Sequence, residues 1–372
     1  MPLASTATVR GLLPGDVKAL GCEIVLGNTF HLMLNPGHEL IERLGGLHAF
    51  MGWDGPIVTD SGGFQVFSMG HGTVADEIKA RPSRNDRERE GAILAIEEEG
   101  VRFRSYIDGG ERFLSPEGSM AVQAALGSDI ALVFDECTPF HVDRDYTARS
   151  TERTHRWLQR CLTWQREHAP SWQLVYGIVQ GGVYEDMRRE SSATVAGSGC
   201  DGVAIGGSLG ADKQQMHEVV GLALAELGGE HEHLPRHLLG IGDVDDLIRG
   251  VELGVDTFDC AMPTRLGRHG TALVADPQAR WRLDLAKSGL REDPAPLIEG
   301  CPCPACASGL SRAYLSYLVR SREITGMRLI TAHNLAFIVA LMRSLREAVI
   351  AGRLDEVAAA LRAGAEPYGL MA

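Results

Sequence analysis

Seven short apolar runs, each followed at once by polar or glycine-rich residues, constrain the fold of this chain more than any other feature. They occupy residues 24–26, 56–58, 130–134, 174–179, 202–205, 237–241 and 255–258. Continuous apolar runs of this length are typical of strands that are buried on both faces of a parallel sheet. Helical patterns lie between several of them, at about 151–168, 185–196, 213–227 and 244–253. This alternation predicts an α/β fold with right-handed crossovers.

The residues that follow six of these seven runs are candidates for a functional site. They are Asp60, Asp135, Gln180, the pair at 206–207, Gly242 and Asp259. In a (β/α)8 barrel, the active site lies at the carboxyl ends of the strands, so such a barrel would bring these residues together. A doubly wound open sheet is the structural alternative. The absence of a glycine-rich dinucleotide fingerprint after the first run favours the barrel.

The chain of 372 residues is long enough for such a barrel and one additional unit. We expect a TIM-barrel catalytic domain at 1–290 and a zinc-binding, helical subdomain at 291–372. The stretch 71–90 is densely charged and poor in apolar residues, which predicts a mobile insertion. Beyond Asn334, an apolar stripe at helical spacing (Leu335, Ile338, Leu341, Met342 and Leu345) predicts a helix that packs on the core.

The strongest local signal is a cluster of three cysteines, Cys301, Cys303 and Cys306, followed by His333. Three thiolates and one imidazole complete a tetrahedral zinc site, with no position left for substrate. We therefore predict a structural zinc ion, held partly by a histidine in the first turn of the next helix. The alternative is three free thiols, which would oxidise readily in this arrangement. The other five cysteines are scattered, which does not indicate a disulfide framework.

Two aspartates at strand ends could carry the chemistry. Asp60 opens the segment 60–65 (DSGGFQ), in which two glycines permit a close approach to a ligand and Phe64 could stack on a planar base. Asp259 precedes Arg265 and Arg268, a pattern that suits an anionic substrate. Two carboxylates on different strands give the arrangement that glycosyl chemistry needs, with one as nucleophile and the other as acid and base.

The charge is distributed unevenly. The net charge is −13, which by itself argues against a nucleic-acid partner, yet residues 265–346 carry twelve Lys or Arg and only six Asp or Glu. A basic segment on an acidic body fits localised phosphate binding, although arginines on solvated helix faces would give the same count. There is no apolar run of membrane-spanning length and no signal-peptide pattern, so we expect a cytoplasmic protein without membrane contact.

Six motifs together resemble the bacterial tRNA-guanine transglycosylase family. In this sequence they are TDSGGFQ, FDEC, GIVQGG, AIGG, FDC-x-MPTR and C-x-C-x2-C with a later histidine, in the family's order, and the likeness extends from about residue 6 to the C-terminal helices. The resemblance implies a zinc-containing TIM barrel, usually a homodimer. It also implies exchange of guanine at the wobble position of GUN-anticodon tRNAs for the 7-deazaguanine preQ1, in queuosine biosynthesis.

The resemblance also implies a role for each matching residue. Asp259 would be the nucleophile toward the ribose anomeric carbon, and Asp60 the general acid and base. Arg265 and Arg268 would lie near the anticodon. The residues implied to line the base pocket are Ser61, Phe64, Gln65, Asp135, Gln180, Gly207 and Leu239.

The sequence departs from the family at three places. The insertion at 71–90 is longer than usual. Residues 1–5 look like only the tail of the family's first barrel strand, so we expect a barrel with a shortened N-terminal part. The sequence leaves open whether this barrel closes. The loop 206–212 is one residue shorter than usual, with Gly210 where bacterial members have valine and Asp212 where they have glutamate. This difference predicts better tolerance of a larger base such as queuine.

Two other function classes stay open at this point. A barrel glycoside hydrolase would share the two carboxylates but would not need a basic segment. A non-catalytic binding subunit should lack Asp60 and Asp259, which are both present.

Overall fold

The computed structural model describes residues 1–71, 93–368 and 370. Its centre is a sheet of eight parallel strands whose spatial order follows the chain. The strands are β1 (Leu3–Ala4), β2 (Val25–Gly27), β3 (Ile57–Thr59), β7 (Ile130–Leu132), β8 (Leu174–Val179), β9 (Gly202–Ile205), β10 (Arg236–Leu238) and β11 (Thr257–Phe258). Each predicted apolar run coincides with or overlaps one of these strands, and β1 supplies the eighth.

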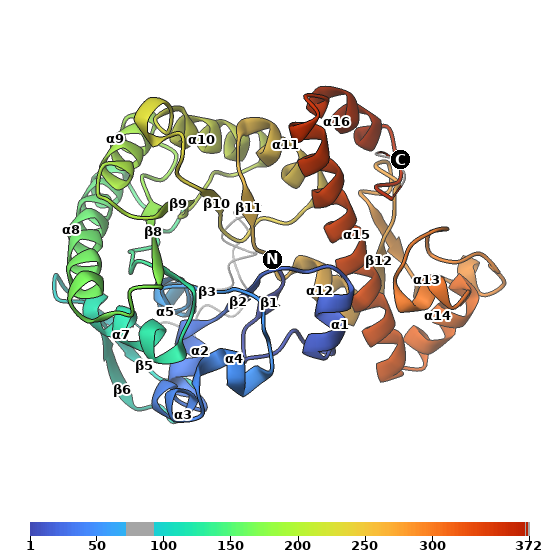
Figure 1. The fold of residues 1–372 in the computed structure, drawn as a ribbon, viewed down its shortest axis with the longest axis horizontal. Coiled ribbons are helices and arrows are strands. Elements are labelled where there is room, and N and C mark those ends of the chain that lie inside the picture. The colour runs from blue at the N-terminus through green and yellow to red at the C-terminus, as the bar shows by residue number, and fades with distance from the viewer. Residues whose placement is uncertain (72–92, 369, 371–372) are drawn as a thin grey trace.

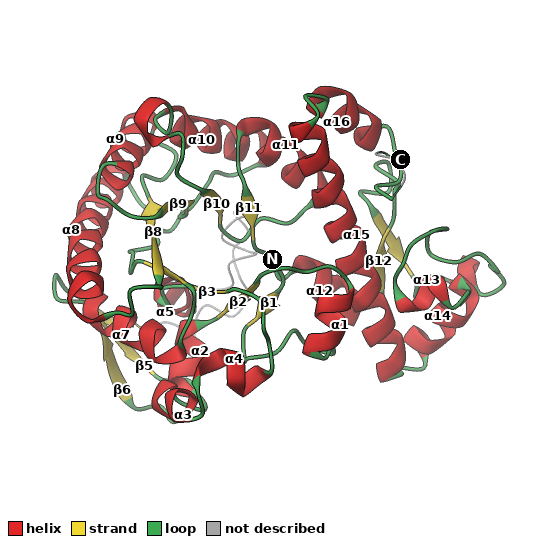
Figure 2. Ribbon diagram, viewed as in Figure 1, coloured by secondary structure: helices red, strands yellow, loops and turns green. Residues whose placement is uncertain are grey.

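The first and last strands close this sheet into a barrel. On one side of β1, Leu3 pairs with Leu26. On the other side, Pro2 forms a parallel bridge with Cys260, whose N–H donates to the carbonyl of Met1 at 3.3 Å. Figure 2 shows the strands as a ring inside a layer of helices. The barrel expectation is therefore confirmed, and a first strand of only two residues is sufficient to connect its neighbours.

Four helices cover the outside of strands β7 to β11 (Figure 1): α8 (Arg144–His168), α9 (Glu185–Ala196), α10 (Lys213–Ala225) and α11 (Val244–Leu253). The predicted bounds of α9 and α11 are confirmed. Helix α8 begins seven residues earlier than predicted, because Asp143 caps it by accepting a hydrogen bond from the N–H of Tyr146 at 2.7 Å. The helix was predicted from the spacing of its apolar residues, and a polar capping residue is not part of that pattern.

The loops after β1, β2 and β3 carry the smaller helices α1 (Pro14–Ala19), α2 (Thr29–Leu34), α3 (His38–Arg43), α4 (Gly46–Met51), α5 (Gly63–His71) and α7 (Pro116–Leu126). An antiparallel sheet lies between α5 and α7, and the sequence patterns did not indicate it. Its strands are β4 (Ile93–Ile96), β5 (Val101–Arg104) and β6 (Glu111–Leu114). Phe103 on β5 packs on Phe30 of α2, with ring centroids 5.2 Å apart. Apart from its first residue, the predicted insertion at 71–90 lies outside the described residues.

The C-terminal region packs along the barrel. It begins with α12 (Met262–Arg268) and the hairpin β12 (Thr271–Leu273) and β13 (Arg282–Asp284), followed by η3 (Ser288–Leu290), α13 (Pro304–Ala307), α14 (Arg312–Arg320), α15 (Ile324–Ile350) and α16 (Leu354–Arg362). The short helix η2 (Gly229–His231) lies earlier in the chain, between α10 and β10. Helices α12 and α15 approach closely, since a Cβ at Gly267 would lie 2.6 Å from the Cα of Thr331. Asn334 joins them by donating to the carbonyls of Pro263 and Thr271.

Helix α15 belongs to the core. Leu335, Leu341 and Leu345 of the predicted stripe are buried. By length and composition alone, the helix could cross a membrane, and we had expected no such segment from the sequence. However, 56% of its most apolar window is buried inside the fold, as in the core helix of a globular domain. It also begins nine residues before His333, so the prediction that this histidine lies in the first turn of its helix is wrong. The apolar stripe starts later than the helix, and this displaced the predicted start.

Candidate active site and metal centre

Asp60 lies at the carboxyl end of β3, in the mouth of the barrel, and is held by the loop after β2. Its Oδ1 accepts from the N–H of Thr29 at 2.8 Å, and its Oδ2 accepts from Asn28 Nδ2 at 2.6 Å and from Gln65 Nε2 at 3.0 Å. Burial raises the pKa of Asp60 to about 7, and the negative charge of Asp259 adds to this rise, while the hydrogen bonds from Thr29 and Gln65 oppose it. A carboxyl group with this pKa exchanges protons readily at neutral pH.

Asp259 lies at the carboxyl end of β11 and is buried. The backbone N–H of Gly240 donates to its Oδ1 at 3.0 Å, and His237 Nε2 lies 3.2 Å from the same oxygen. The other ring nitrogen of His237 lies 2.9 Å from the hydroxyl of Thr257. Among the described residues, no hydrogen bond reaches Oδ2 of Asp259. Two contacts therefore fix the carboxylate through one oxygen and leave the second oxygen available for chemistry.

A third carboxyl group, Asp135, lies at the end of β7 and is held from both sides. The hydroxyl of Ser61 donates to Oδ1 at 3.0 Å, and Nε2 of Gln180 donates to Oδ2 at 2.6 Å. Burial raises the pKa of Asp135 to about 6, against the opposing effect of the hydrogen bonds from Ser61 and Gln180. The structure thus joins residues from three loops that the sequence placed at separate strand ends.

Gln180 and Gly207 face each other across the ends of β8 and β9. A Cβ at Gly207 would lie 2.1 Å from Oε1 of Gln180, and the φ of Gly207 is +77°, so only glycine fits at this position. The Oε1 atom of Gln180 is buried and has no hydrogen-bond partner among the described residues. A buried acceptor of this kind is suited to receive a donor from a ligand. The side chain of Leu239 lies close by, since a Cβ at Gly206 would be 3.3 Å from its Cδ1.

The two remaining predicted pocket residues lie at the start of α5. Gln65 contacts Asp60, as described above, whereas Phe64 is 37% exposed as a residue. An aromatic ring that is open on one side can stack on a planar ligand.

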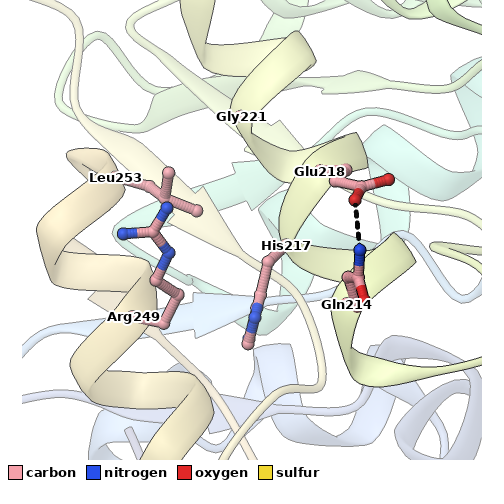
Figure 3. Close-up of a pocket in the computed structure, with 6 residues that line it drawn as sticks. All are labelled: Gln214, His217, Glu218, Gly221, Arg249 and Leu253. Carbon is pink, nitrogen blue, oxygen red and sulfur yellow. Dashed lines mark hydrogen bonds between the residues drawn. The ribbon is translucent and has the colours of Figure 1, made fainter.

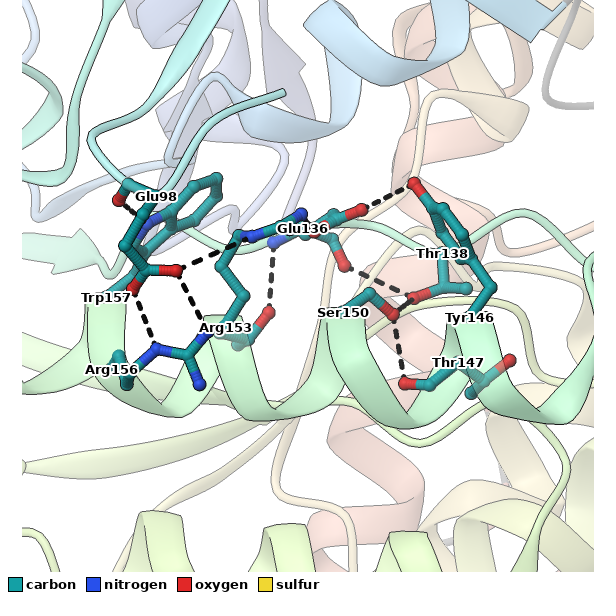
Figure 4. A network of polar contacts seen from close by, with 10 residues as sticks. Glu98, Glu136, Thr138, Tyr146, Thr147, Ser150, Arg153, Arg156 and Trp157 are labelled. Carbon is teal, nitrogen blue, oxygen red and sulfur yellow. Dashed lines mark hydrogen bonds and ion pairs between the residues drawn. The ribbon is translucent and has the colours of Figure 1, made fainter. Parts of the chain in front are cut away.

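A polar network fixes the loop that follows Asp135 (Figure 4). The next residue, Glu136, is buried and accepts from Tyr146 at 2.7 Å and from Arg153 Nη1 at 2.5 Å. Its own N–H donates to the hydroxyl of Thr154 at 3.0 Å. All three partners belong to α8, so this helix holds the segment that carries Asp135.

Sequence reasoning missed three residues of the site: Asn28, Thr29 and His237. The first two follow the apolar run of β2 directly, so the rule that located Asp60 and Asp259 would have found them. His237 lies within an apolar run, and its side chain became significant only when β10 and β11 were placed side by side.

The two predicted RNA-binding residues, Arg265 and Arg268, lie on α12. The pKa of Arg268 is lowered mainly by partial burial, and the positive charges of Arg10 and Arg265 lower it further. The guanidinium group of Arg268 therefore lies within electrostatic reach of both other arginines.

The structure brings Cys301, Cys303, Cys306 and His333 together. Their ligand atoms all lie within 4.8 Å of one another, and the three sulfurs are 3.4–3.6 Å from His333 Nδ1. A tetrahedral ion with ordinary zinc–sulfur and zinc–nitrogen bonds would place these atoms about 3.6 Å apart. His333 Nε2 lies 2.8 Å from the carbonyl of Leu273, which orients the ring, and the hydroxyl of Tyr368 lies 3.1 Å from Sγ of Cys301. The cluster can therefore hold a metal ion, and its donor set fits zinc.

A separate hollow of about 590 Å³ lies between α10 and α11 on the outside of the barrel (Figure 3). Its lining contains none of the predicted site residues and consists of Gln214, His217, Glu218, Gly221, Arg249 and Leu253.

The fold and the site define a class: a TIM barrel with carboxylates at the ends of its strands and a closed three-cysteine, one-histidine cluster. The family model described as queuine tRNA-ribosyltransferase matches residues 1–366, so the chain belongs to this family. The family comprises tRNA-guanine transglycosylases, which are pentosyltransferases, and the resemblance found in the sequence is confirmed.

Curated relatives agree with this assignment. The chain is 50% identical over 368 residues to the queuine tRNA-ribosyltransferase of Roseiflexus sp. (strain RS-1), covering 96% of this chain and 90% of the relative. It is 46% identical over 355 residues to that of Pelotomaculum thermopropionicum, covering 95% and 87% of the two chains. It is 44% identical over 358 residues to that of Symbiobacterium thermophilum, covering 96% and 82%.

Proposed function

We propose that this chain exchanges the guanine at the wobble position of GUN-anticodon tRNAs for preQ1, through a covalent ribosyl–aspartate intermediate. One observation carries the proposal: Asp60 and Asp259 lie in one barrel mouth, close enough for the charge of one to raise the pKa of the other, yet in different environments. Two carboxyl groups with distinct environments suit the roles of nucleophile and proton carrier.

In the first step, Asp259 attacks the anomeric carbon of the ribose through Oδ2, the oxygen that the N–H of Gly240 and His237 leave available. The bond from carbon to guanine breaks as the bond from carbon to Oδ2 forms, and protonated Asp60 gives its proton to the departing base. In the second step, the Asp60 carboxylate takes a proton from the incoming base, which displaces Asp259. One base replaces another, with no change in oxidation state.

The base pocket follows from the remaining predicted residues. Asp135, oriented by Ser61 and Gln180, accepts from the N–H groups along one edge of the base, and Gln180 Oε1 accepts a further N–H. Gly207 presents its backbone to the same edge, while Phe64 and Leu239 lie against the ring. These residues bind the base after it has left the stack of the anticodon loop.

The two steps should respond to pH in opposite ways. Adduct formation needs protonated Asp60, so above the pKa of about 7 it should slow about tenfold for each pH unit. Displacement by the incoming base needs the carboxylate and should slow below that pKa. Rapid-quench measurement of the protein–tRNA adduct gives the pH dependence of adduct formation when no nucleobase is added. The same measurement with added preQ1 or guanine gives the pH dependence of displacement. An adduct-formation rate that does not change across pH 7 would contradict this assignment.

A structural zinc ion completes the proposal. Cys301, Cys303, Cys306 and His333 would hold it, and four protein ligands leave no position for substrate. Through Leu273 and His333, the site links the β12–β13 hairpin to α15, which packs on α12. We propose that the subdomain 291–372 supports α12, whose Arg265 and Arg268 bind tRNA phosphates, while the barrel in 1–290 performs the chemistry.

The choice of base concerns Gly210. Its φ is +122°, and a Cβ there would lie 2.8 Å from Cγ of Gln215, so this loop has no room for a valine side chain. We expect preQ1 to be the better substrate and queuine to be accepted more readily than by a member with valine at this position. A pocket discriminates a methylene-sized difference by only ~1–3 kcal/mol. Competition kinetics with both bases measure this, and undetectable queuine incorporation would contradict it.

The protein is proposed to act in the cytoplasm as a homodimer. Tyr314 and Tyr317 on α14 and Ile324 at the start of α15 are exposed, and Tyr317 retains 58% of its surface. Exposed aromatic and aliphatic side chains so close in sequence suit contact with a second copy. Light scattering of the wild type and of Tyr317→Glu tests this, with a dimer expected only for the wild type.

The decisive experiment is incorporation of labelled guanine into a GUN-anticodon tRNA. We expect exchange with this tRNA and none with a tRNA that has another base at the wobble position. Release of sugar from small glycosides without tRNA exchange would instead support a glycoside hydrolase. Binding of tRNA without exchange would support a non-catalytic subunit.

A further inference from the structure

Arg188, on α9, is a fully buried arginine within the barrel wall, with a relative exposure of 0%. It forms no ion pair with a carboxylate in the part of the chain that the structure describes. Burial lowers the pKa of Arg188 to about 10, so the side chain remains a cation at neutral pH. A buried cation is costly unless other groups satisfy it, so the contacts that hold it are informative.

These contacts are four backbone carbonyl groups. Nε donates to Gly182 at 2.7 Å. Nη1 donates to Val179 at 3.2 Å and to Gly206 at 2.9 Å, and Nη2 donates to Ser208 at 2.9 Å. Two of the acceptors belong to the end of β8 and its loop, and two to the loop after β9. A single planar guanidinium therefore joins the two loops.

The positions of the carbonyls matter because they bracket the proposed base-binding residues. Gln180 lies between Val179 and Gly182, and Gly207 lies between Gly206 and Ser208. Each of the two residues is thus enclosed by backbone groups that Arg188 holds. The strands themselves are joined up to the N–H of Gly206, which donates to the carbonyl of Val179 at 3.1 Å. Arg188 extends this link beyond the strand ends, to the carbonyls of Gly182 and Ser208.

The remainder of α9 supports the same loop. Ser191, one turn beyond Arg188, accepts from the N–H of Gln180 at 3.1 Å. Gly181 has a φ of +125°, and a Cβ there would lie 2.9 Å from the backbone nitrogen of Arg188, so the loop lies directly on the helix. The Gln180 side chain, whose Nε2 is bound by Asp135, is then fixed at both ends.

We propose that Arg188 is a positioning residue for base recognition, which sets the separation of Gln180 and Gly207 without touching the substrate. The inference rests on the proposed function of these two residues. Lysine cannot replace it fully, because an ammonium group donates from one point and cannot span four carbonyls in two loops.

The test compares Arg188→Met and Arg188→Lys with wild type in labelled-guanine exchange. We expect the KM for guanine to rise about tenfold or more in Arg188→Met and by less in Arg188→Lys, while the KM for tRNA stays within about twofold. Arg189→Met is the matched control, since the neighbouring Arg189 is on the exposed side and pairs with Glu185 and Glu226. It should leave both KM values unchanged.

A double-variant cycle with Gln180→Ala distinguishes positioning from a general loss of stability. If Arg188 acts through Gln180, the KM of the double variant for guanine should be no higher than the larger of the two single-variant KM values. If the two residues act independently, the increases in KM of the single variants should multiply in the double variant. If Arg188→Met does not fold, Arg188→Lys gives the deciding KM. An unchanged KM for guanine in a folded variant, or equal increases in both KM values, would overturn the inference.

Direct binding of guanine by calorimetry separates this inference from the proposed function. A wild-type protein that binds guanine but does not exchange it would overturn the function alone, and the loss of binding in Arg188→Met would still support the inference. A wild-type protein that binds no guanine would overturn both.

Discussion

The Asp259→Asn variant is expected to lose guanine exchange, by on the order of 10⁴-fold or more, while it still binds tRNA. The amide retains one oxygen that can accept from the N–H of Gly240 and contact His237, so the local hydrogen bonds survive the change. The second atom becomes an NH₂ group, which has no electron pair available to form an ester with the ribose. The loss therefore falls on bond formation and not on the fold.

Denaturing gels of enzyme mixed with tRNA measure this result directly. Wild type should give a covalent adduct that disappears when excess base is added, and the variant should give none. Asp256→Asn is the control, because Asp256 lies at the amino end of the same strand, and the hydrogen bond that its side chain makes in the described part of the chain is to the backbone N–H of Arg236, at 2.8 Å. It should keep the adduct. An adduct of full yield in Asp259→Asn would exclude this residue as the nucleophile.

The Cys303→Ser variant is expected to lose the metal ion and much of its stability together. Binding of a structural zinc ion contributes to folding on the order of 10 kcal/mol, and serine is a poor ligand for zinc. Cys303 Sγ lies 3.4 Å from His333 Nδ1, as a ligand to the same ion would. Its removal would leave the cluster without one of its three sulfurs, so the loop 301–306 would separate from α15.

Elemental analysis and thermal unfolding test this prediction. Wild type should contain one zinc per chain, and Cys303→Ser should contain none and unfold at a much lower temperature. Cys200→Ser is the control, because Cys200 is buried far from the cluster in sequence and its Sγ donates to the carbonyls of Val195 and Gly202, as a hydroxyl can. It should retain the zinc. A zinc-free wild-type preparation with full activity would refute the structural role.

The sequence by itself determined the barrel and most of its mouth. Apolar runs buried on both faces are a local property of the chain, so the positions of seven strands followed from composition within short windows. The polar residue after each run was then located without any knowledge of the fold, which is how Asp60, Asp135, Gln180 and Asp259 were found. The metal ligands Cys301, Cys303 and Cys306 were found because their spacing is local.

What only the tertiary structure decided depends on contacts between distant segments. Closure of the barrel depends on a bridge between Pro2 and Cys260, which no local pattern specifies. The pairing of β10 with β11 places His237 against Asp259, and the packing of α9 places Arg188 between two loops. The pKa of Asp60 likewise depends on burial and on the charge of a residue 199 positions away in the chain. Residue type and spacing identify the groups that can react, but burial and proximity set their chemistry, and both arise only when the chain has folded.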